Sequence, residues 1–218
     1  MIPPVARRDH MPANGLYAIT DGPRAGLLEA ARAALEGGAT LLQYRDKTRD
    51  VARRLREACS LAALCREFAV PLIINDDVGL ARSSGAAGVH LGVDDVDIAD
   101  ARGMLGDHAI IGVSCYDSLR RAHAAATAGA NYLAFGAFFA TATKKVTRHA
   151  TPALLHDAKA IGLPLVAIGG ITPDNGRALL DAGADFLAVV SALFGSRDVR
   201  AQARRFTALF ESSSRNPT

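Results

Sequence analysis

The stretch LPLVAIGGITPDNGRALLDAGADFLAVVSA, residues 163–192, decides the fold class of this chain. Two short apolar runs, 163–170 and 186–192, enclose a segment, 173–184, in which apolar residues recur at helical spacing. Short runs without polar alternation are typical of strands that are buried on both faces of a sheet. A strand, a helix and a second strand in this order predict a βαβ unit, whose two strands are parallel.

The rest of the chain repeats this unit. Eight apolar runs occur, at 16–20 (LYAIT), 40–44 (TLLQY), 71–75 (PLIIN), 88–92 (GVHLG), 109–114 (AIIGVS), 132–139 (YLAFGAFF), 163–170 (LPLVAIGG) and 186–192 (FLAVVSA). Segments with helical spacing lie at 27–38, 51–68, 117–130, 173–184 and 199–210. Eight strand–helix units in 218 residues predict a (β/α)8 TIM barrel near the lower size limit of that fold. A doubly wound parallel sheet is the alternative, and the regular count of eight favours closure.

The chain is expected to form one domain, because no linker rich in proline or serine divides residues 15–210. We place the barrel at 15–211, after an N-terminal extension over 1–14 and before a C-terminal tail over 212–218. The ends of a chain are commonly less ordered than the domain between them.

Composition excludes several classes of protein. Half of the residues are hydrophobic and 22% are charged, which is typical of a globular chain rather than a disordered one. No apolar stretch approaches the ~20 residues of a membrane helix, and residues 1–15 hold no apolar core of a secretory signal. Cys59, Cys65 and Cys115 are odd in number and form no CxxC motif, so neither a disulfide framework nor a zinc site is indicated. We therefore expect a soluble, cytoplasmic protein without a membrane partner.

The positive charge of the chain is small, with 25 basic against 22 acidic residues. Most arginines lie beside acids in the segments of helical spacing, and no aromatic residues are interleaved with them as in proteins that bind single-stranded nucleic acid. We expect these arginines to form solvated helix surface, and we expect no nucleic-acid partner.

The candidate functional residues follow the apolar runs, because a barrel of this kind builds its active site at the C-terminal ends of the strands. Strand alternation places Gln43, Arg45 and Lys47 on one face, directed into the barrel mouth. Two cations and an amide at one strand end predict a phosphate-containing ligand. The alternative is a strand end held by a salt bridge to Asp46.

Acidic residues follow the third and fourth runs. Asp76 and Asp77 come after Asn75, and Asp94 and Asp95 follow the fourth run. Carboxylates at neighbouring strand ends can share Mg²⁺ together with substrate phosphates. The alternative is that these aspartates cap the following helices.

Two polar residues lie within or at the end of apolar runs. His90 stands inside an apolar strand, so we interpret it as a packed, hydrogen-bonded core histidine rather than a base. Ser114 ends the fifth run without an evident activating triad, which favours a hydrogen-bonding role over covalent catalysis.

The last three strand ends predict a second anion site. The loop Thr141-Ala142-Thr143-Lys144-Lys145 supplies hydroxyls and cations. Gly169 and Gly170 precede a helix, where a backbone can approach an anion, and Ser191 follows the eighth strand. Phosphate sites after strands seven and eight recur in this fold. A substrate pair with a diphosphate on one partner and a monophosphate on the other would fill both sites.

The ordered set of segments resembles the thiamine phosphate synthase family. The matching segments are LQYRDK (42–47), IINDDVGLA (73–81), GVHLGVDD (88–95), IGVSC (111–115), FGAFFATATKK (135–145), VAIGGITPDN (166–175) and VVSALF (189–194). Single segments such as IGGIT occur in other phosphate-binding barrels, whereas the complete series is specific. The resemblance implies a (β/α)8 barrel and an enzyme, a transferase of thiamine biosynthesis. Its substrates would be an aminohydroxymethylpyrimidine diphosphate and a thiazole phosphate, or the carboxylated form of the latter. The products would be thiamine phosphate and pyrophosphate, formed through a pyrimidine carbocation.

The resemblance also implies roles for individual residues. The diphosphate would be held by Arg45, Lys47, Asn75 and Lys144, of which Arg45, Lys47 and Lys144 would be catalytic. The cofactor Mg²⁺ would be bound by Asp76 and Asp95, with Asp94 a poorer match for the second ligand. The pyrimidine would be contacted by Gln43 and Ser114. The thiazole phosphate would be held by Thr141, Thr143, Gly170, Val190 and Ser191.

The chain departs from the family pattern at several positions. Val93 stands where many members have Gln, Asp77 where Arg is common, and Ala137 and Ala140 where Pro is frequent. Tyr116 stands where many members, and related thiazole tautomerases, have His. A thiazole tautomerase is one alternative function, which the loss of that candidate base weakens. A non-catalytic barrel that binds thiamine phosphate is the other, and a homo-oligomer is left open as a partner.

Overall fold

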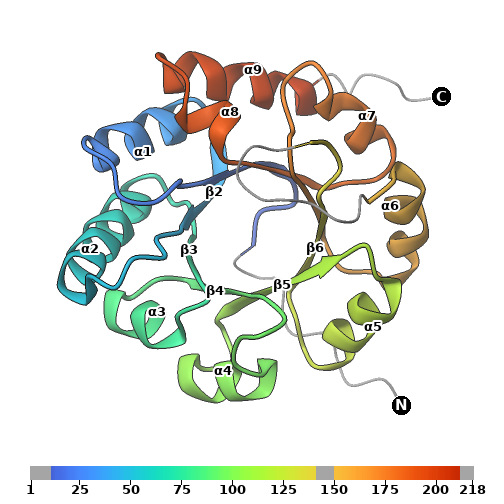
Figure 1. Cartoon of the computed structure of the whole chain (residues 1–218), viewed down its shortest axis with the longest axis horizontal. Helices are drawn as coiled ribbons and strands as arrows, with labels where there is room; N and C mark the ends of the chain where they lie inside the picture. Colours follow the sequence, from blue (N-terminus) through green and yellow to red (C-terminus); the bar gives the residue numbers. More distant parts are fainter. Residues whose placement is uncertain (1–10, 141–149, 212–218) are drawn as a thin grey trace.

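The computed structural model describes residues 11–140 and 150–211 of the chain. Eight strands pair in the order β1 to β8 and close into a barrel, and every neighbouring pair is parallel. Figure 1 shows this barrel at the centre of a ring of helices. The predicted TIM barrel is therefore confirmed, and closure excludes the doubly wound alternative.

Each of the eight predicted apolar runs overlaps one strand, although β1 and β2 begin one residue earlier and β5 ends two residues later than predicted. The strands are β1 (Gly15–Ile19), β2 (Ala39–Tyr44), β3 (Leu72–Asn75), β4 (Gly88–Leu91), β5 (Ile110–Tyr116), β6 (Tyr132–Gly136), β7 (Leu165–Ile168) and β8 (Phe186–Val189). The helices are α1 (Leu27–Glu36), α2 (Val51–Glu67), α3 (Val78–Ser84), α4 (Ile98–Leu105), α5 (Leu119–Thr127), α6 (Pro152–Ala158), the 3-10 turn η1 (Lys159–Ile161), α7 (Gly176–Asp181), α8 (Ser191–Phe194) and α9 (Val199–Glu211).

The helix predicted at 173–184 is shorter than its apolar spacing indicates. It begins at Gly176, because Asn175 accepts a hydrogen bond from the Thr172 backbone N–H at 2.8 Å and donates to the Gly170 carbonyl at 3.1 Å. These bonds hold the residues after β7 in a loop rather than a first helical turn. The short helices α3, α4, α6 and α8 were not among the predicted segments, since so few residues show little periodicity.

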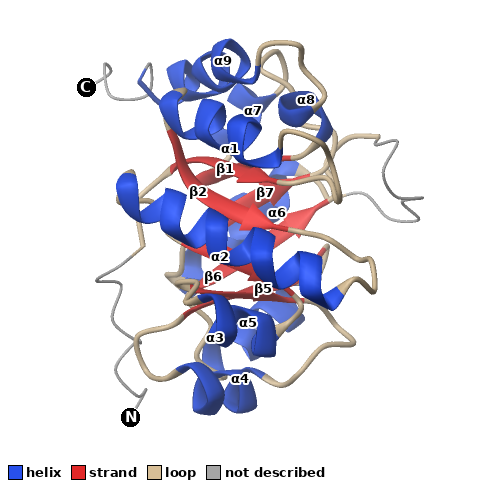
Figure 2. Ribbon diagram, turned by 90° about the vertical axis from the view of Figure 1, so that its left-hand side faces the viewer, coloured by secondary structure: helices blue, strands red, loops and turns tan. Residues whose placement is uncertain are grey.

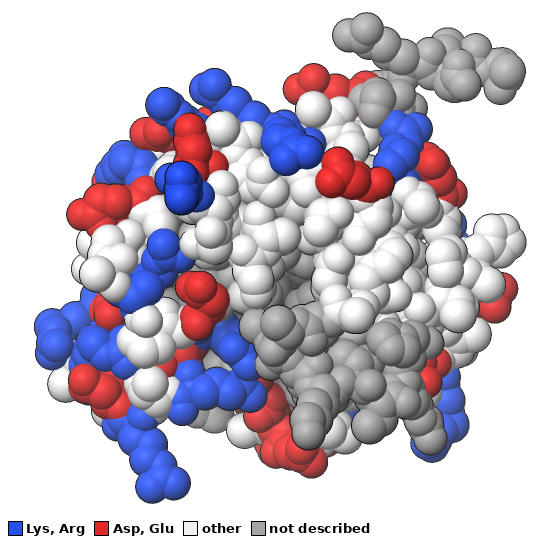
Figure 3. All heavy atoms as spheres, turned by 45° about the horizontal axis from the view of Figure 1, so that its top comes forward, with Lys and Arg blue, Asp and Glu red and all other residues white. Residues whose placement is uncertain are grey.

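All strands run in the same direction, so their C-terminal ends meet at one end of the barrel. Figure 2 shows the strands enclosed by the helices in side view, and Figure 1 looks onto the end where the strands finish. We call this end the mouth. Figure 3 shows that the surface is hollowed near the mouth, with basic and acidic side chains gathered toward the side of α1 and α2 and uncharged surface toward α7.

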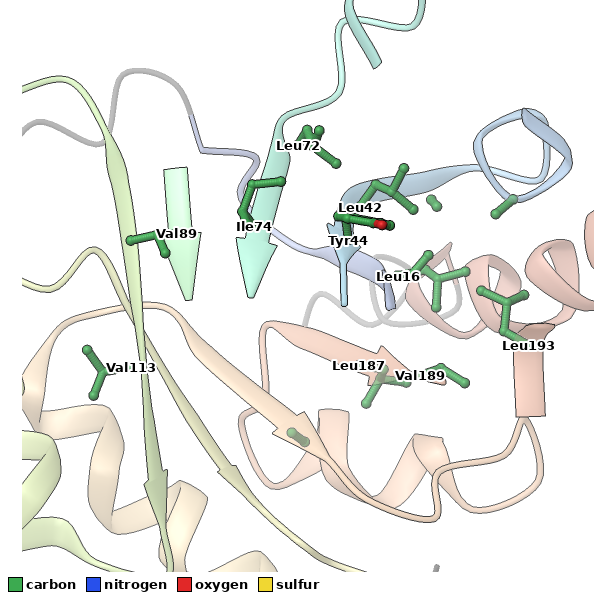
Figure 4. Packing of buried hydrophobic residues seen from close by; sticks show 14 of the residues in the cluster. Leu16, Leu42, Tyr44, Leu72, Ile74, Val89, Val113, Leu187, Val189 and Leu193 are labelled. Carbon is green, nitrogen blue, oxygen red and sulfur yellow. The ribbon is translucent and has the colours of Figure 1, made fainter. Parts of the chain in front are cut away.

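Two apolar layers result from strand alternation. The outer layer fills the space between barrel and helices and includes Leu16 of β1, Leu42 of β2 and Leu193 of α8, all drawn in Figure 4. The inner layer fills the barrel with side chains such as Leu41 and Phe186. Because successive residues of a strand point to opposite faces, the next inward position after Leu41 is Gln43. Within the described ranges, no helix combines the length and apolar character needed to cross a membrane.

Candidate active site

The charged side of the mouth begins at the end of β2. The Arg45 backbone N–H donates to Oγ1 of Thr20 at 2.8 Å, which ties the end of β2 to the residue after β1. Lys47 extends further out, and its Nζ lies 3.2 Å from Oδ2 of Asp76. In the described part of the chain, the Arg45 guanidinium has no ion-pair partner. Arg45 is therefore available for an anion at the mouth.

Asp46 lies between these two cations in the sequence, and its side chain makes its contacts outside the barrel. Its Oδ2 lies 2.7 Å from Nη2 of Arg53 on α2, and its Oδ1 accepts from the Thr48 backbone N–H at 2.8 Å. Burial alone would raise the pKa of Asp46, but the hydrogen bonds from Thr48 and Arg53 lower it. Asp46 thus forms its salt bridge with Arg53 of α2 rather than with Arg45 or Lys47, so the alternative in which Asp46 holds these two cations is wrong.

Asp76 follows β3 in an unusual backbone conformation. Its φ of 64° lies in the left-handed region, which costs a residue other than glycine about 1–3 kcal/mol. Burial, followed by the nearby Asp95 carboxyl, raises the pKa of Asp76, while Lys47 opposes the shift. Two carboxylates therefore crowd together beside one cation. A further positive charge would stabilise this arrangement.

Asp95 reaches this cluster from the loop after β4. Its Oδ2 accepts from the Gly92 backbone N–H at 2.6 Å, which fixes the side chain over the loop. Asp94 is exposed. Among the described residues, no group of three or more His, Cys, Asp or Glu side chains has the arrangement of a metal site. Two carboxylates with substrate phosphates are nevertheless a usual donor set for Mg²⁺, so the residues present fit this ion.

Asp77 has the capping role that was the alternative for these aspartates. Its Oδ1 accepts from the Leu80 backbone N–H at 2.8 Å, and its Oδ2 lies 3.0 Å from Nη2 of Arg54. Asn75 ends β3 beside His90 in the strand register and is half-buried. The end of β3 thus directs Asp76 to the mouth and Asp77 to α3.

The floor of the mouth is polar although it lies inside the barrel. Nε2 of Gln43 donates to the Tyr17 hydroxyl at 2.7 Å, and that hydroxyl lies 2.8 Å from the Tyr132 hydroxyl. The Tyr132 hydroxyl lies 2.9 Å from Nδ1 of His90, whose Nε2 lies 2.9 Å from Oγ of Ser114. Burial lowers the pKa of His90 to about 4, so its imidazole is neutral near pH 7. The interpretation of His90 as a hydrogen-bonded core histidine is confirmed.

The sequence reasoning missed Tyr17 and Tyr132. Both lie in predicted strands at inward positions, and both are buried. The available signal was their alternation with outward residues such as Leu16 and Leu133, combined with a hydroxyl that needs a partner inside the barrel.

The uncharged side of the mouth is formed after β7 and β8. Gly170 has a φ of +65°, and a Cβ there would lie 2.5 Å from the Ala140 carbonyl oxygen. Only glycine fits this close approach of two loops. The Phe139 backbone N–H donates to the Gly169 carbonyl at 3.1 Å, which further joins the two segments. Val190 and Ser191 form the turn from β8 into α8, where the Phe194 N–H donates to the Val190 carbonyl at 3.0 Å.

Three predicted site residues lie outside the described ranges, namely Thr141, Thr143 and Lys144. Of the positions that depart from the family pattern, Val93 is exposed. Tyr116 ends β5 with a φ of 57°, and the Arg121 guanidinium lies 5.8 Å from its ring centre. A cavity of about 440 Å³ lies at the opposite end of the barrel, where Met11, Lys159 and Asp185 line it, and takes no part in the mouth.

Comparison with known proteins finds similarity over nearly the whole barrel. Residues 16–193 match the family model described as thiamine monophosphate synthase. A thiamine-phosphate synthase of Xanthomonas campestris pv. campestris (strain 8004) is 56% identical over 199 residues, which cover 91% of this chain and 96% of the relative. A thiamine-phosphate synthase of Marinobacter nauticus is 52% identical over 201 residues, with 90% of each chain covered. The solved structure of a thiamine phosphate pyrophosphorylase from Pyrococcus furiosus has a TM-score of 0.83 and 35% identity, covering 92% of this chain and 96% of that one.

Proposed function

This chain belongs to the thiamine monophosphate synthase family, and from that premise we propose how its barrel mouth makes thiamine phosphate. The chain is a transferase of thiamine biosynthesis that acts on small-molecule substrates. It joins the pyrimidine diphosphate and the thiazole phosphate and releases pyrophosphate. These substrates are charged phosphate esters, which supports a cytoplasmic location as part of the proposal.

The reaction divides into bond breaking and bond making. The bond between the pyrimidine methylene carbon and the diphosphate oxygen breaks, and its electron pair leaves with pyrophosphate. The thiazole nitrogen then donates its lone pair to the cationic carbon and forms the new C–N bond. Negative charge grows on the leaving group as the first bond breaks, so groups that hold this charge lower the barrier.

Arg45 and Lys47 are the proposed catalytic residues on the described side of the mouth, together with Lys144. The observation that carries this role is the position of Arg45 and Lys47 directly after β2, with Nζ of Lys47 3.2 Å from Oδ2 of Asp76, whose carboxyl adjoins that of Asp95. Arg45 can bind two phosphate oxygens with its planar fork. Lys47 would exchange its contact with Asp76 for a phosphate oxygen. The proposed diphosphate contact of Asn75 lies at the adjoining strand end.

Asp76 and Asp95 would hold Mg²⁺. When bound, the ion supplies positive charge to the diphosphate oxygens as the leaving group departs. The two carboxylates are already crowded, as the raised pKa of Asp76 indicates, and both supply only oxygen donors. Oxygen donors are the ligands that Mg²⁺ prefers.

The remaining site residues divide between the two organic groups. Gln43 and Ser114 lie at opposite ends of the polar floor and would contact the pyrimidine. Gly170, Val190 and Ser191 would hold the thiazole phosphate partly through backbone groups, together with Thr141 and Thr143. The separation of this uncharged side from the charged side supports two distinct anion sites.

The test of this proposal is turnover of purified protein with both substrates and Mg²⁺, followed as pyrophosphate and thiamine phosphate. Arg45→Ala should lower kcat about 100-fold or more, because it removes one donor to the leaving group. Arg49→Ala is the matched control, since Arg49 lies exposed in the same loop, and it should keep wild-type turnover. Circular dichroism should show both variants folded. Near-normal turnover of Arg45→Ala contradicts the role of that residue, and a wild type that forms neither product contradicts the function.

A further inference from the structure

Five polar side chains inside the barrel form one continuous row of hydrogen bonds. The row runs from Gln43 on β2 through Tyr17 on β1, Tyr132 on β6 and His90 on β4 to Ser114 on β5. Its four donor–acceptor distances lie between 2.7 and 2.9 Å. Gln43, which is buried, and Ser114, which is half-buried, are its two ends.

Each member of the row has few protons to donate, so the direction of one hydrogen bond determines the direction of the next. A tyrosine hydroxyl has one proton to donate, and a neutral imidazole has one N–H and one acceptor nitrogen. Gln43 donates to the Tyr17 oxygen, so the Tyr17 proton is left for Tyr132. The Tyr132 proton then goes to Nδ1 of His90, and the His90 Nε2–H goes to Ser114.

With the Gln43 N–H directed at Tyr17, any other direction leaves a buried proton without a partner. Tyr17 is 1% exposed and Tyr132 is 0% exposed. If Tyr132 donated to Tyr17 instead, the Tyr17 hydroxyl would have no acceptor among the described residues, because Gln43 already presents its N–H. A buried donor without a partner is costly.

Tyr17, Tyr132 and His90 are all uncharged near neutral pH, so each carries the number of protons assumed above. Burial raises the pKa of Tyr17 and of Tyr132 well above the ordinary value. Burial lowers the pKa of the His90 imidazole, as described above.

A glycine in β5 provides the space in which the row forms. Gly112 of β5 lies between His90 and Tyr132 in the strand register, and a Cβ on it would lie 1.8 Å from Cζ of Tyr132. The absence of a side chain lets the Tyr132 ring lie across β5 and stack on His90, with ring centres 5.6 Å apart and planes at 21°. The row is thus supported by packing and by hydrogen bonds.

We propose that Tyr17, Tyr132 and His90 are positioning residues that fix Gln43 as a hydrogen-bond acceptor and Ser114 as a donor toward the mouth. Oε1 and the second Nε2–H of Gln43 and the Ser114 hydroxyl proton are the groups that the row leaves over, and Oε1 is the only acceptor among them that belongs to Gln43. Together they select a nitrogen heterocycle that offers an amino N–H to one end and an unprotonated ring nitrogen to the other. This inference rests on the proposed function, because an aminopyrimidine is such a ring.

The first experiment determines the tautomer of His90, and with it the direction of the hydrogen bonds in the row, without any ligand. Nitrogen-15 NMR of the wild type should show His90 as the tautomer protonated at Nε2, with its signals assigned from their loss in His90→Asn. Tyr132→Phe should mix the two tautomers, because Nδ1 loses its donor. Tyr44→Phe is the matched control, since Tyr44 is a buried tyrosine whose hydroxyl bonds Glu57 outside the barrel, and it should leave the His90 signals unchanged. A wild type protonated at Nδ1 overturns the proposal.

The second experiment measures binding of two alcohols without a leaving group, 4-amino- and 4-oxo-5-hydroxymethyl-2-methylpyrimidine, by calorimetry. The wild type and Tyr44→Phe should prefer the amino compound about tenfold or more, since the oxo compound places an acceptor against Gln43. Tyr17→Phe and Tyr132→Phe should bring this preference near parity. If either folded variant keeps the wild-type preference, the proposal is wrong.

The two experiments separate this inference from the proposed function. A wild type that releases pyrophosphate, combined with unchanged preference in either Tyr→Phe variant, contradicts only the positioning role. A wild type that releases no pyrophosphate contradicts the function, and the tautomer of His90 then decides the inference by itself.

Discussion

At the scale of single residues, the two aspartates after β3 show how one backbone angle separates two roles. Asp76 is left-handed, with φ at 64°, and its carboxylate lies beside Lys47. Asp77 is extended, with φ at −92°, and its carboxylate caps α3. An aspartate therefore contributes to the mouth at position 76 and caps a helix at position 77.

Asp76→Asn tests the proposed Mg²⁺ site. Asparagine tolerates the left-handed region, so the backbone should be kept while one anionic ligand is lost. We expect half-maximal turnover to require about tenfold more Mg²⁺, or more, in a titration of the rate. Asp77→Asn is the control, because asparagine also caps helices, and its Mg²⁺ titration should match the wild type. An unchanged titration for Asp76→Asn contradicts its role as a ligand.

At the scale of elements, a glycine in β5 leaves space that a side chain of the neighbouring strand β6 occupies. Gly112 is paired with His90 on one side and Tyr132 on the other. A glycine inside a strand weakens it, and here the space it leaves is filled by a neighbouring aromatic ring.

Gly112→Ala should therefore displace the Tyr132 ring. We expect the free energy of unfolding to fall by about 1–3 kcal/mol in urea titrations, as in other overpacked cores. Gly103→Ala in α4 is the matched control, because a Cβ there meets nothing within 4 Å. Removing a helical glycine should raise the stability of the control by about 0.5–1 kcal/mol. Equal stability of Gly112→Ala and the wild type would contradict the packing described here.

At the scale of the whole molecule, the mouth has two unlike sides. The ends of β2, β3 and β4 carry the charged groups Arg45, Lys47, Asp76 and Asp95, while the ends of β7 and β8 offer glycine and backbone groups. Figure 3 shows the same division on the surface. This asymmetry supports a diphosphate on one side and a monophosphate on the other.

Binding of pyrophosphate with Mg²⁺ should stabilise the entire barrel. A ligand at about 100 times its Kd adds about 2.7 kcal/mol, which corresponds to a rise in Tm of about 5–10 °C for a chain of this size. Calorimetry should show this rise, and a chelator should remove the part that depends on Mg²⁺. Arg45→Ala should give a clearly smaller rise than the control Arg49→Ala. No shift in the wild type would mean that the charged side of the mouth does not bind pyrophosphate.

Much of the fold and part of the site follow from local pattern. The eight apolar runs placed all eight strands, since buried parallel strands need continuous apolar sequence. Alternation along β2 predicted that Gln43 faces inward, and the bond to Tyr17 confirms it. Short helices such as α3 and α8 escaped prediction because they are stabilised by tertiary packing more than by their own periodicity.

By itself, the sequence determined the barrel, the strands that compose it and the residues that end each strand. These depend on local periodicity and on the rule that parallel strands share one end. Only the tertiary structure decided that Asp76 and Asp77 separate, and that Tyr17, Tyr132 and His90 join Gln43 to Ser114. Hydrogen bonds between residues as far as 115 positions apart depend on closure of the barrel, which brings strands together irrespective of their distance in the chain.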